Sequence, residues 1–310
     1  MRNSILYGDC RETLKQFASY TDKARMCVTS PPYYGLRDYG GEENQIGQEQ
    51  SPEDFIKNLV EVFGLVRDCL TDDGTLWVNI GDSYYNYRPG KGQAYPKQSV
   101  SKTKQDLPDK CNKRGNKLEG LKEKDLIGIP WMLAFALRAD GWYLRQDIIW
   151  HKPNPMPESV KDRCTKSHEY IFLLSKNKNY YYNNEAIKEP VKQDWGTRDR
   201  TKGKYHNEGT GLQPHSGLTK SYTKKNKRSV WSVTKKPYKG AHFATFPPEL
   251  IEPCIKAGSE VGDIILDPFM GSGTTAMVAK MLDRYYIGCE LHEDYGDLIQ
   301  ERVPVNVSYL

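Results

Sequence analysis

Several features that define large classes of proteins are missing from this sequence of 310 residues. None of its seven cysteines belongs to a C-x-x-C pair, which excludes the usual zinc-finger spacings and argues against a disulfide scaffold. No run of about 18 apolar residues is present, so no membrane-spanning helix is expected. The amino-terminal residues MRNSILYGDC lack the apolar stretch of a signal peptide. We therefore expect a cytoplasmic protein without a membrane partner.

A strong net charge is also missing, because 45 Lys and Arg face 40 Asp and Glu, for a balance of +5. The charges are unevenly distributed. Residues 88–124 hold 11 basic and 4 acidic residues, and residues 197–240 hold 12 and 2, which leaves 22 basic and 34 acidic residues elsewhere. Isolated charge runs are usually solvated loops, but basic segments also neutralise nucleic-acid phosphates. Charge alone does not decide between these two explanations.

Outside the two basic segments, strand and helix patterns alternate, which is typical of an α/β sheet flanked by helices. Ser51 and Pro52 are a strong helix start, with Ser as N-cap and Pro at the first helical position. The predicted strands span 24–29, 75–80, 142–150, 169–175, 263–266 and 286–290. The other predicted helices span 130–139, 248–257, 274–282 and 293–302. The length fits one large α/β domain or two small ones.

A glycine loop joins the predicted strand 263–266 to the helix that follows it. It reads Asp267-Pro268-Phe269-Met270-Gly271-Ser272-Gly273-Thr274-Thr275. Glycine lets a backbone approach a ligand closely, and a helix amino terminus favours an anionic group. The loop is not a Walker A motif, and it lacks the third glycine of a dinucleotide fingerprint. Glu290 ends the next strand, where a carboxylate can bind ribose hydroxyls. The pattern predicts a nucleoside-containing cofactor, with Asp267 placed for a cationic amino group, which S-adenosylmethionine has and NAD lacks.

A second motif, Thr29-Ser30-Pro31-Pro32-Tyr33, stands at the end of the predicted strand 24–29. Its two prolines fix the backbone and remove two N–H donors, which leaves carbonyl oxygens and the Ser30 hydroxyl as hydrogen-bond acceptors. Such an array suits a substrate amino group, and Tyr33 offers a flat face for stacking on a base. A stiff surface turn explains these five residues equally well.

Together, TSPPY and DPFMGSGTT resemble motifs IV and I of the exocyclic-amino DNA methyltransferases, and their order along the chain is that of the β class. Leu6-Tyr7-Gly8-Asp9-Cys10 resembles the family's amino-terminal segment, whose Asp and following backbone contact the cofactor adenine. Residues 145–150 and 168–172 resemble its middle motifs, and residues 242–247 resemble motif X. The resemblance covers nearly the whole chain. It implies a Rossmann-like sheet that binds S-adenosyl-L-methionine, with an inserted basic target-recognition region.

The same resemblance implies the residues of the site. The implied catalytic residues are Ser30, Pro31, Pro32 and Tyr33. The implied cofactor-binding residues are Asp9, Cys10, Thr29, Phe243, Thr245, Asp267, Phe269, Gly271, Ser272, Gly273, Thr274 and Glu290. No metal site is expected, because the histidine spacing matches none of the common ones. Methylation at cytosine C5 would need a cysteine nucleophile, but Cys254 falls within the predicted helix 248–257 and before the cofactor loop, so we expect it to be a buried structural residue.

The resemblance also implies a division of the chain and a reaction. The expected parts are 1–87 and 125–175 as catalytic core, 176–240 as target-recognition region and 241–310 as cofactor-binding half. Residues 88–124 are expected to be either a second DNA-contacting loop or a mobile insertion. Ser rather than Asp at the start of the Pro-Pro motif favours transfer to N4 of a flipped-out cytosine in duplex DNA, the alternatives being N6 of adenine or an inactive DNA-binding relative. A prokaryotic or phage modification system, a companion restriction endonuclease and a monomer or homodimer are the corresponding expectations.

Overall fold

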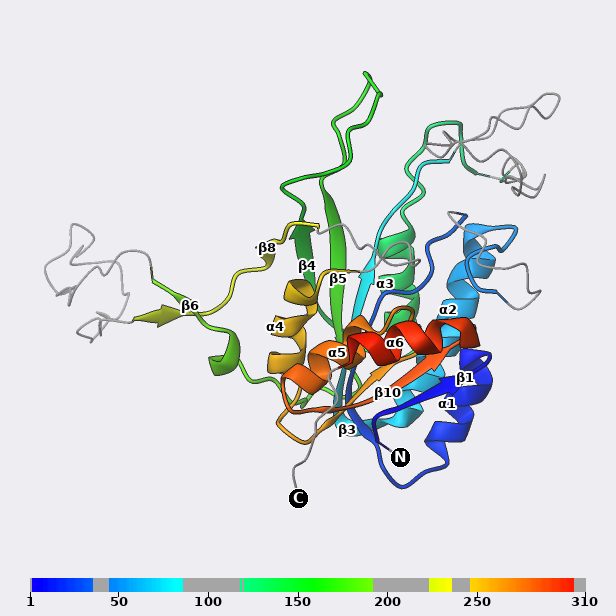
Figure 1. Cartoon of the computed structure of the whole chain (residues 1–310). Coiled ribbons are helices and arrows are strands. Elements are labelled where there is room, and N and C mark those ends of the chain that lie inside the picture. Colours follow the sequence, from blue (N-terminus) through cyan, green and yellow to red (C-terminus); the bar gives the residue numbers. More distant parts are fainter. Residues whose placement is uncertain are drawn as a thin grey trace, which may run out of the picture. The chain divides into compact units, whose positions relative to one another are not determined.

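The computed structural model of the chain describes residues 2–35, 45–85, 118, 120–191, 223–235 and 246–303. They belong to two compact units, one made of Met1–Tyr182 with Ser229–Leu310 and the other of Asn183–Arg228. The larger unit is built on one mixed sheet of eight strands (Figure 1). In sheet order these strands are β1 (Ser4–Tyr7), β10 (Tyr285–Glu290), β9 (Ile264–Asp267), β2 (Ala24–Thr29), β3 (Leu70–Ile80), β5 (His168–Ser175), β4 (Tyr143–His151) and β8 (Val230–Ser232).

The direction of the strands brings many loops to one edge of this sheet. Strands β1, β10, β9, β2 and β3 are parallel neighbours, and only β5 runs the opposite way. The direction in which the chain adds strands reverses between the neighbours β2 and β9. From β2 the chain continues to β3 on one side, and from β9 it continues to β10 on the other. In open α/β sheets such a switch point, at the carboxyl ends of the strands, is where ligands bind. Residues 30–33 and 268–273 both begin at this point.

Helices cover both faces of the sheet, because successive strand side chains point to opposite sides. On one face, α1 (Cys10–Ala18), α2 (Pro52–Cys69) and α3 (Ile129–Ala139) pack in one apolar cluster that includes Cys27 of β2. On the other face, α4 (Pro248–Gly258) ends against Met26 and Trp77, which leave no room for a Cβ at Gly258. Figure 1 shows α4, α5 (Thr274–Met281) and α6 (Gly296–Arg302) on the near side of the sheet.

Most predicted elements are confirmed to within a residue or two at each end. The Ser51 side chain caps α2 by accepting a hydrogen bond from the Asp54 N–H at 3.1 Å, as the Ser-Pro start predicts. Two predictions are wrong in detail. Strand β3 begins at Leu70 rather than residue 75. Its pairing with β2 starts with Leu70 opposite Ala24 and then shifts register, so that Thr75 lies opposite Met26 and the residues between them are included in the strand. The helix predicted at 293–302 is a 3-10 turn, Glu293–Tyr295, followed by α6.

The smaller unit falls within the predicted target-recognition region 176–240. Its described elements are a 3-10 turn, Glu185–Ile187, and the antiparallel pair β6 (Glu189–Pro190) and β7 (Lys224–Lys225). Glu189 forms ion pairs with Lys227 at 3.5 Å and Arg228 at 3.4 Å. Most of the basic segment 88–124, and most of 197–240, lie outside the described residues. The predicted division of the chain therefore stays a prediction.

The described residues are expected to hold no membrane span, no metal site and no cysteine nucleophile. No helix there is long and apolar enough to cross a membrane. No group of three or more His, Cys, Asp or Glu side chains in those ranges is arranged to hold a metal ion. None of the six cysteines in that part of the chain forms a disulfide, and Cys254 is fully buried inside α4.

Candidate active site

A cavity of about 320 Å³ opens at the sheet edge where the strands β1, β2, β3, β9 and β10 end. Eleven of the predicted site residues line it: Asp9, Cys10, Ser30, Pro31, Pro32, Tyr33, Phe269, Gly271, Ser272, Thr274 and Glu290. Three others, Thr29, Asp267 and Gly273, do not line it. The last two, Phe243 and Thr245, lie outside the described residues. The structure thus brings together two motifs that are more than 230 positions apart in the sequence.

Glu290 ends β10 and places its carboxylate on the cavity wall. Its Oε2 accepts a hydrogen bond from the Gly271 N–H at 2.8 Å, and its Oε1 accepts one from the His292 N–H at 3.1 Å. Burial raises the pKa of Glu290, while these backbone donors oppose that rise. Each oxygen uses one lone pair inside the protein and keeps one for a ligand donor, such as a sugar hydroxyl.

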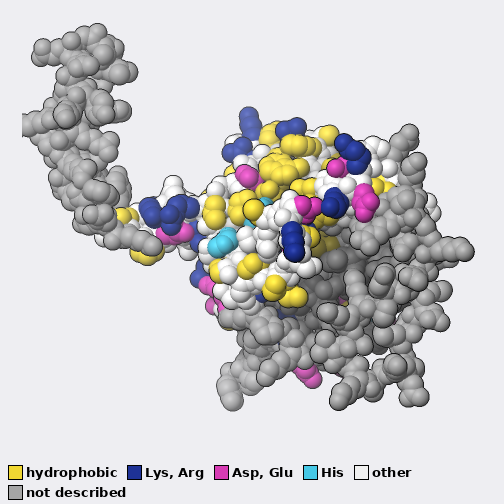
Figure 2. All heavy atoms as spheres, turned by 90° about the horizontal axis from the view of Figure 1, so that it is seen from above, with side chains coloured by type: hydrophobic (Ala, Val, Ile, Leu, Met, Phe, Trp, Pro, Cys, Tyr) yellow, Lys and Arg dark blue, Asp and Glu magenta, His cyan; other side chains and the backbone are white. Residues whose placement is uncertain are grey.

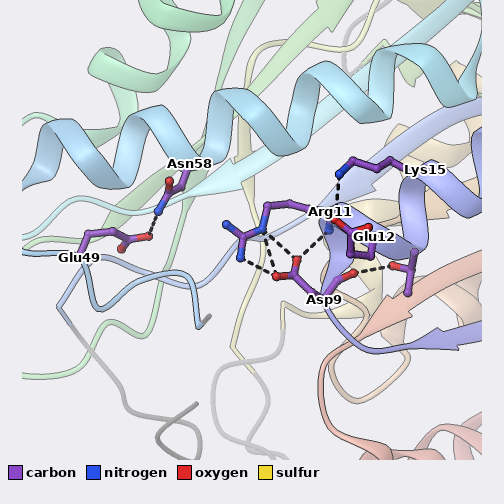
Figure 3. A network of polar contacts seen from close by, with 7 residues as sticks. Asp9, Arg11, Glu12, Lys15, Glu49 and Asn58 are labelled. Carbon is purple, nitrogen blue, oxygen red and sulfur yellow. Dashed lines mark hydrogen bonds and ion pairs between the residues drawn. The ribbon is translucent and has the colours of Figure 1, made fainter. Parts of the chain in front are cut away.

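Asp9 follows β1 and caps the amino terminus of α1. Figure 3 shows its carboxylate held by Arg11, whose backbone N–H and guanidinium both donate to it, at 2.9 Å and 3.0 Å for Oδ1. Partial burial works to raise the pKa of Asp9, but the Arg11 hydrogen bonds outweigh burial and the net pKa is lowered. The carboxylate is therefore ionised and fixed in orientation at the cavity wall. Beside it, burial raises the pKa of the Cys10 thiol to about 12, so this cysteine stays protonated and unreactive.

Asp267 lies beneath the cavity rather than on its wall, with 1% of its surface exposed. Its Oδ1 accepts hydrogen bonds from the Thr29 hydroxyl at 2.6 Å and the Phe269 N–H at 3.0 Å. Its Oδ2 accepts one from the Thr275 hydroxyl at 2.6 Å. Burial raises the pKa of Asp267 to about 6, against the effect of these donors. The carboxylate therefore ties the end of β2, the glycine loop and the start of α5 together, and its predicted contact with a ligand amino group stays a prediction.

The glycine loop needs its glycines for backbone reasons. Gly271 and Gly273 have φ angles of +53° and +79°, in the left-handed region that other residues rarely adopt. A Cβ at Gly273 would also lie 3.0 Å from the Ile299 Cγ2 atom of α6. The loop thereby turns sharply into α5, and Gly271 and Ser272 reach the cavity wall.

The Ser-Pro-Pro-Tyr segment forms the opposite wall. Ser30 directly follows β2 and is half-buried. Gly47 packs against Pro32, and a Cβ at Gly47 would lie 3.3 Å from both the Pro32 Cβ and the Tyr33 carbonyl oxygen. The two prolines and this packing make the segment a rigid wall whose acceptors are the Ser30 hydroxyl and the backbone carbonyls.

The structure adds polar residues to this wall that the sequence does not single out. Glu169, at the start of β5, lines the cavity and accepts a hydrogen bond from the Tyr33 hydroxyl at 2.8 Å. Its other oxygen pairs with the buried ammonium of Lys152. Burial lowers the pKa of Lys152, although the nearby Glu169 carboxylate acts to raise it. Asn79 at the end of β3 donates to the Tyr170 carbonyl at 3.1 Å. The only sequence signal for Glu169 is its place in a middle motif.

The lining suits a nucleoside cofactor such as S-adenosyl-L-methionine. Glu290 offers acceptors for the two ribose hydroxyls, and Phe269 offers an aromatic surface to a base. The backbone at Gly271 carries no side chain that would bar close approach. A volume of about 320 Å³ lies within the range of pockets that hold small molecules. Asp9, Phe269, Gly271 and Glu290 are the residues that would hold it.

Comparisons with known proteins agree with this geometry. A family model described as a DNA methylase matches residues 24–301. The chain is 47% identical over 300 residues to the type II methyltransferase M.Cfr9I of Citrobacter freundii, a match that covers 97% of this chain and 87% of that protein. It is 47% identical over 304 residues to the type II methyltransferase M.SmaI of Serratia marcescens, with 96% and 90% covered.

Two solved structures share the fold. The PvuII DNA methyltransferase, described as cytosine-N4-specific, matches with a TM-score of 0.63 at 16% identity and covers 99% of this chain and 88% of its own. The M1.HpyAVI–SAM complex matches with a TM-score of 0.54 at 19% identity, with 97% and 99% covered. From the family match and the close relatives, the chain belongs to the N6/N4 family of DNA methylases and is a type II DNA methyltransferase that depends on S-adenosyl-L-methionine.

Proposed function

We propose that this enzyme methylates the exocyclic N4 of a cytosine that is flipped out of duplex DNA. The observation that carries the proposal is the Ser30-Pro31-Pro32-Tyr33 wall, which faces the same cavity as Glu290 and the glycine loop. S-Adenosyl-L-methionine, when bound, supplies an electrophilic methyl group on its sulfonium. The residues of the chain then have to present a nucleophilic nitrogen to that methyl group.

An exocyclic amino nitrogen is a poor nucleophile, because its lone pair is delocalised into the ring. The Ser30 hydroxyl and the Pro31 carbonyl are proposed to accept hydrogen bonds from the two amino protons and to hold the nitrogen close to tetrahedral geometry, with its lone pair aimed at the methyl group. Rigid acceptors cost no reorganisation at the moment of transfer. The Tyr33 ring would stack on the flipped base, because the target atom is out of reach inside a duplex.

The choice of base rests on Ser30. In related sequences Ser at this position usually accompanies cytosine N4 methylation and Asp usually accompanies adenine N6 methylation. The cytosine-N4-specific PvuII enzyme shares the fold, which agrees with cytosine as the target. Adenine N6 is the second candidate, because adenine offers a similar amino edge.

The cofactor contacts follow from the lining residues. Glu290 is proposed to accept the ribose hydroxyls, and Asp9 with the Cys10 backbone to contact the adenine edge. Asp267 is proposed to act chiefly by holding β2 and the glycine loop in place, since its two oxygens are engaged by Thr29, Phe269 and Thr275.

DNA is proposed to approach the edge where the cavity opens. The β4–β5 connection, residues 152–167, lies at this edge. Apart from the buried Lys152, it carries three basic residues, Lys161, Arg163 and Lys166, against two acidic ones. Figure 2 shows Lys and Arg side chains beside hydrophobic and acidic ones on the described part of the face seen from above. Sequence discrimination is proposed to reside in residues 176–240. The enzyme is proposed to act as a monomer or homodimer, beside a companion endonuclease of the same specificity.

The test is the identity of the product. The enzyme is expressed in a host without DNA methylation, and the host DNA is digested to nucleosides for mass spectrometry. The proposal requires N4-methylcytosine. Detection of N6-methyladenine would mean that adenine, not cytosine, is the target base. Detection of 5-methylcytosine would overturn the mechanism.

A further inference from the structure

The ring of Tyr33 is fixed from two sides. Its hydroxyl donates a 2.8 Å hydrogen bond to Glu169 Oε2. The ring edge lies against Gly81, where an added Cβ would be 2.8 Å from Tyr33 Cε2 and 3.3 Å from Cζ. Any side chain at position 81 would therefore push the ring, and loss of the Glu169 acceptor would release its far end. A ring that only filled space would need neither restraint.

Glu169 is itself held by a buried cation. Lys152 Nζ donates to Glu169 Oε1, and Lys152 as a whole is 7% exposed. The same ammonium lies 4.3 Å from the centre of the Trp150 ring, whose indole N–H donates to the Val233 carbonyl at 2.8 Å. Asn79 Nδ2 also donates to Glu169 Oε2, at 3.4 Å. Lys152, Trp150 and Asn79 thus fix the position of the carboxylate that receives the tyrosine hydroxyl.

Stability is a poor explanation for this arrangement. Removing two charges from water costs about as much as their attraction returns, and apolar replacements of buried ion pairs are often neutral or stabilising. An ion pair does, however, fix direction, because each partner must meet specific donor and acceptor positions. Glu169 lies on the cavity wall, where it meets the one aromatic side chain of the Ser-Pro-Pro-Tyr segment, and Lys152 holds it from behind that wall.

We propose that Glu169 and Lys152 are positioning residues that act through the Tyr33 hydroxyl and hold the ring in the orientation that receives the flipped base. This inference rests on the proposed stacking role of Tyr33. Glu169 would then never need to touch the base. A direct contact between Glu169 and the base is the competing possibility, and the experiment separates the two.

The test is a double-mutant cycle on methyl transfer to duplex DNA, with Tyr33→Phe, Glu169→Gln and the double variant. Tyr33→Phe keeps the stacking ring and removes the hydroxyl that donates to Glu169. We expect each single variant to lower kcat by about tenfold with little change in KM for DNA, and the double variant to lower it by about tenfold as well, because groups that act through one bond are not additive. A loss of about a hundredfold in the double variant would mean independent action and would overturn the proposal. So would wild-type turnover in Tyr33→Phe.

The matched control is Glu252→Gln, which removes the charge of another lysine-paired glutamate, on α4 and away from the cavity. It is expected to leave kcat unchanged. Urea unfolding of every variant shows whether the fold is intact. Tyr33→Phe decides the question even if Glu169→Gln unfolds, because it leaves the Lys152–Glu169 pair in place.

A second readout follows the base itself. A duplex with 2-aminopurine in place of the target base emits strongly when the base leaves the stack and less when it stacks on an aromatic ring. Tyr33→Phe and Glu169→Gln are expected to raise the emission of the bound complex by the same factor, about twofold. Emission equal to that of the wild type in both variants would contradict a positioning role. Product analysis of the wild type reports on the proposed target base independently, so a failure of that assignment is distinguishable from a failure of the positioning.

Discussion

The buried carboxylate of Asp267 gives a quantitative prediction about pH and stability. In the folded state its pKa is about 6, against an ordinary value of 3.8, because burial penalises the ionised form. The folded protein therefore binds this proton more tightly than the unfolded chain, and stability falls as pH rises through the window between these values. In Asp267→Asn the charge is gone, and the Thr275 hydroxyl can rotate to accept from the new amide.

The size of the effect follows from the two pKa values. At about 1.4 kcal/mol per pKa unit, the ionisable side chain costs the folded state about 1.5 kcal/mol at pH 5 and about 3 kcal/mol at pH 8. The unfolding free energy of the wild type should therefore drop by about 1.5 kcal/mol relative to Asp267→Asn between pH 5 and pH 8. Urea titrations of both proteins at the two pH values measure this difference.

The matched control is Asp68→Asn, the same change at an exposed position at the end of α2. The control removes an exposed carboxylate, so the substitution itself should change the unfolding free energy by no more than about 0.5 kcal/mol. If the wild type and Asp267→Asn keep a constant stability difference from pH 5 to pH 8, the carboxylate does not carry a raised pKa. The account of its burial between Thr29 and Thr275 would then be wrong.

Three further predictions concern the cofactor loop and the reaction class. Glu290→Gln places an amide near the Gly271 N–H and weakens the ribose site, so calorimetry should show about tenfold weaker cofactor binding. Unchanged affinity would mean that Glu290 does not bind the cofactor. Gly273→Ala forces a methyl group into a φ of +79° and to 3.0 Å from Ile299, and should lower the unfolding free energy by about 1–3 kcal/mol in urea; a stability equal to the wild type would contradict the argument from backbone conformation. Cys254→Ala should keep turnover within about twofold, since the thiol is buried in α4; an inactive variant with an intact fold would point to a cysteine nucleophile.

Much of the fold could be predicted because its signals are local. The Ser51-Pro52 start of α2 and the strand, loop and helix around Asp267 depend on a few neighbouring residues, and the structure confirms these elements. Strand β1 is not predicted, since four residues, Ser4–Tyr7, are too few to show a period, and the helix α1 that follows it is not predicted either. The start of β3 is misplaced because the register shift opposite Ala24 and Met26 depends on the partner strand.

The candidate site divides in the same way. Ser30 stands out because it directly follows a strand within a motif, and Glu290 stands out because it ends the strand after the glycine loop. The bond from Glu169 to Tyr33 joins residues 136 positions apart, and it depends on the antiparallel pairing of β5 with both β3 and β4. The burial of Lys152 depends on the same pairing, together with the Trp150 ring beneath its ammonium. Lysine is usually exposed, so the sequence alone favours a solvated side chain at this position.

The proposed role of the Ser30 hydroxyl is to prepare the amino nitrogen for transfer, with little effect on cofactor or DNA affinity. This role is tested by the single-turnover rate constant of methyl transfer for Ser30→Ala, at saturating duplex DNA and S-adenosyl-L-methionine, beside cofactor and DNA affinities measured by calorimetry. Losing one hydrogen bond made in the transition state should slow transfer by about a hundredfold, with both affinities within about twofold of the wild type. A Ser30→Ala enzyme that transfers the methyl group at the wild-type rate would contradict the account.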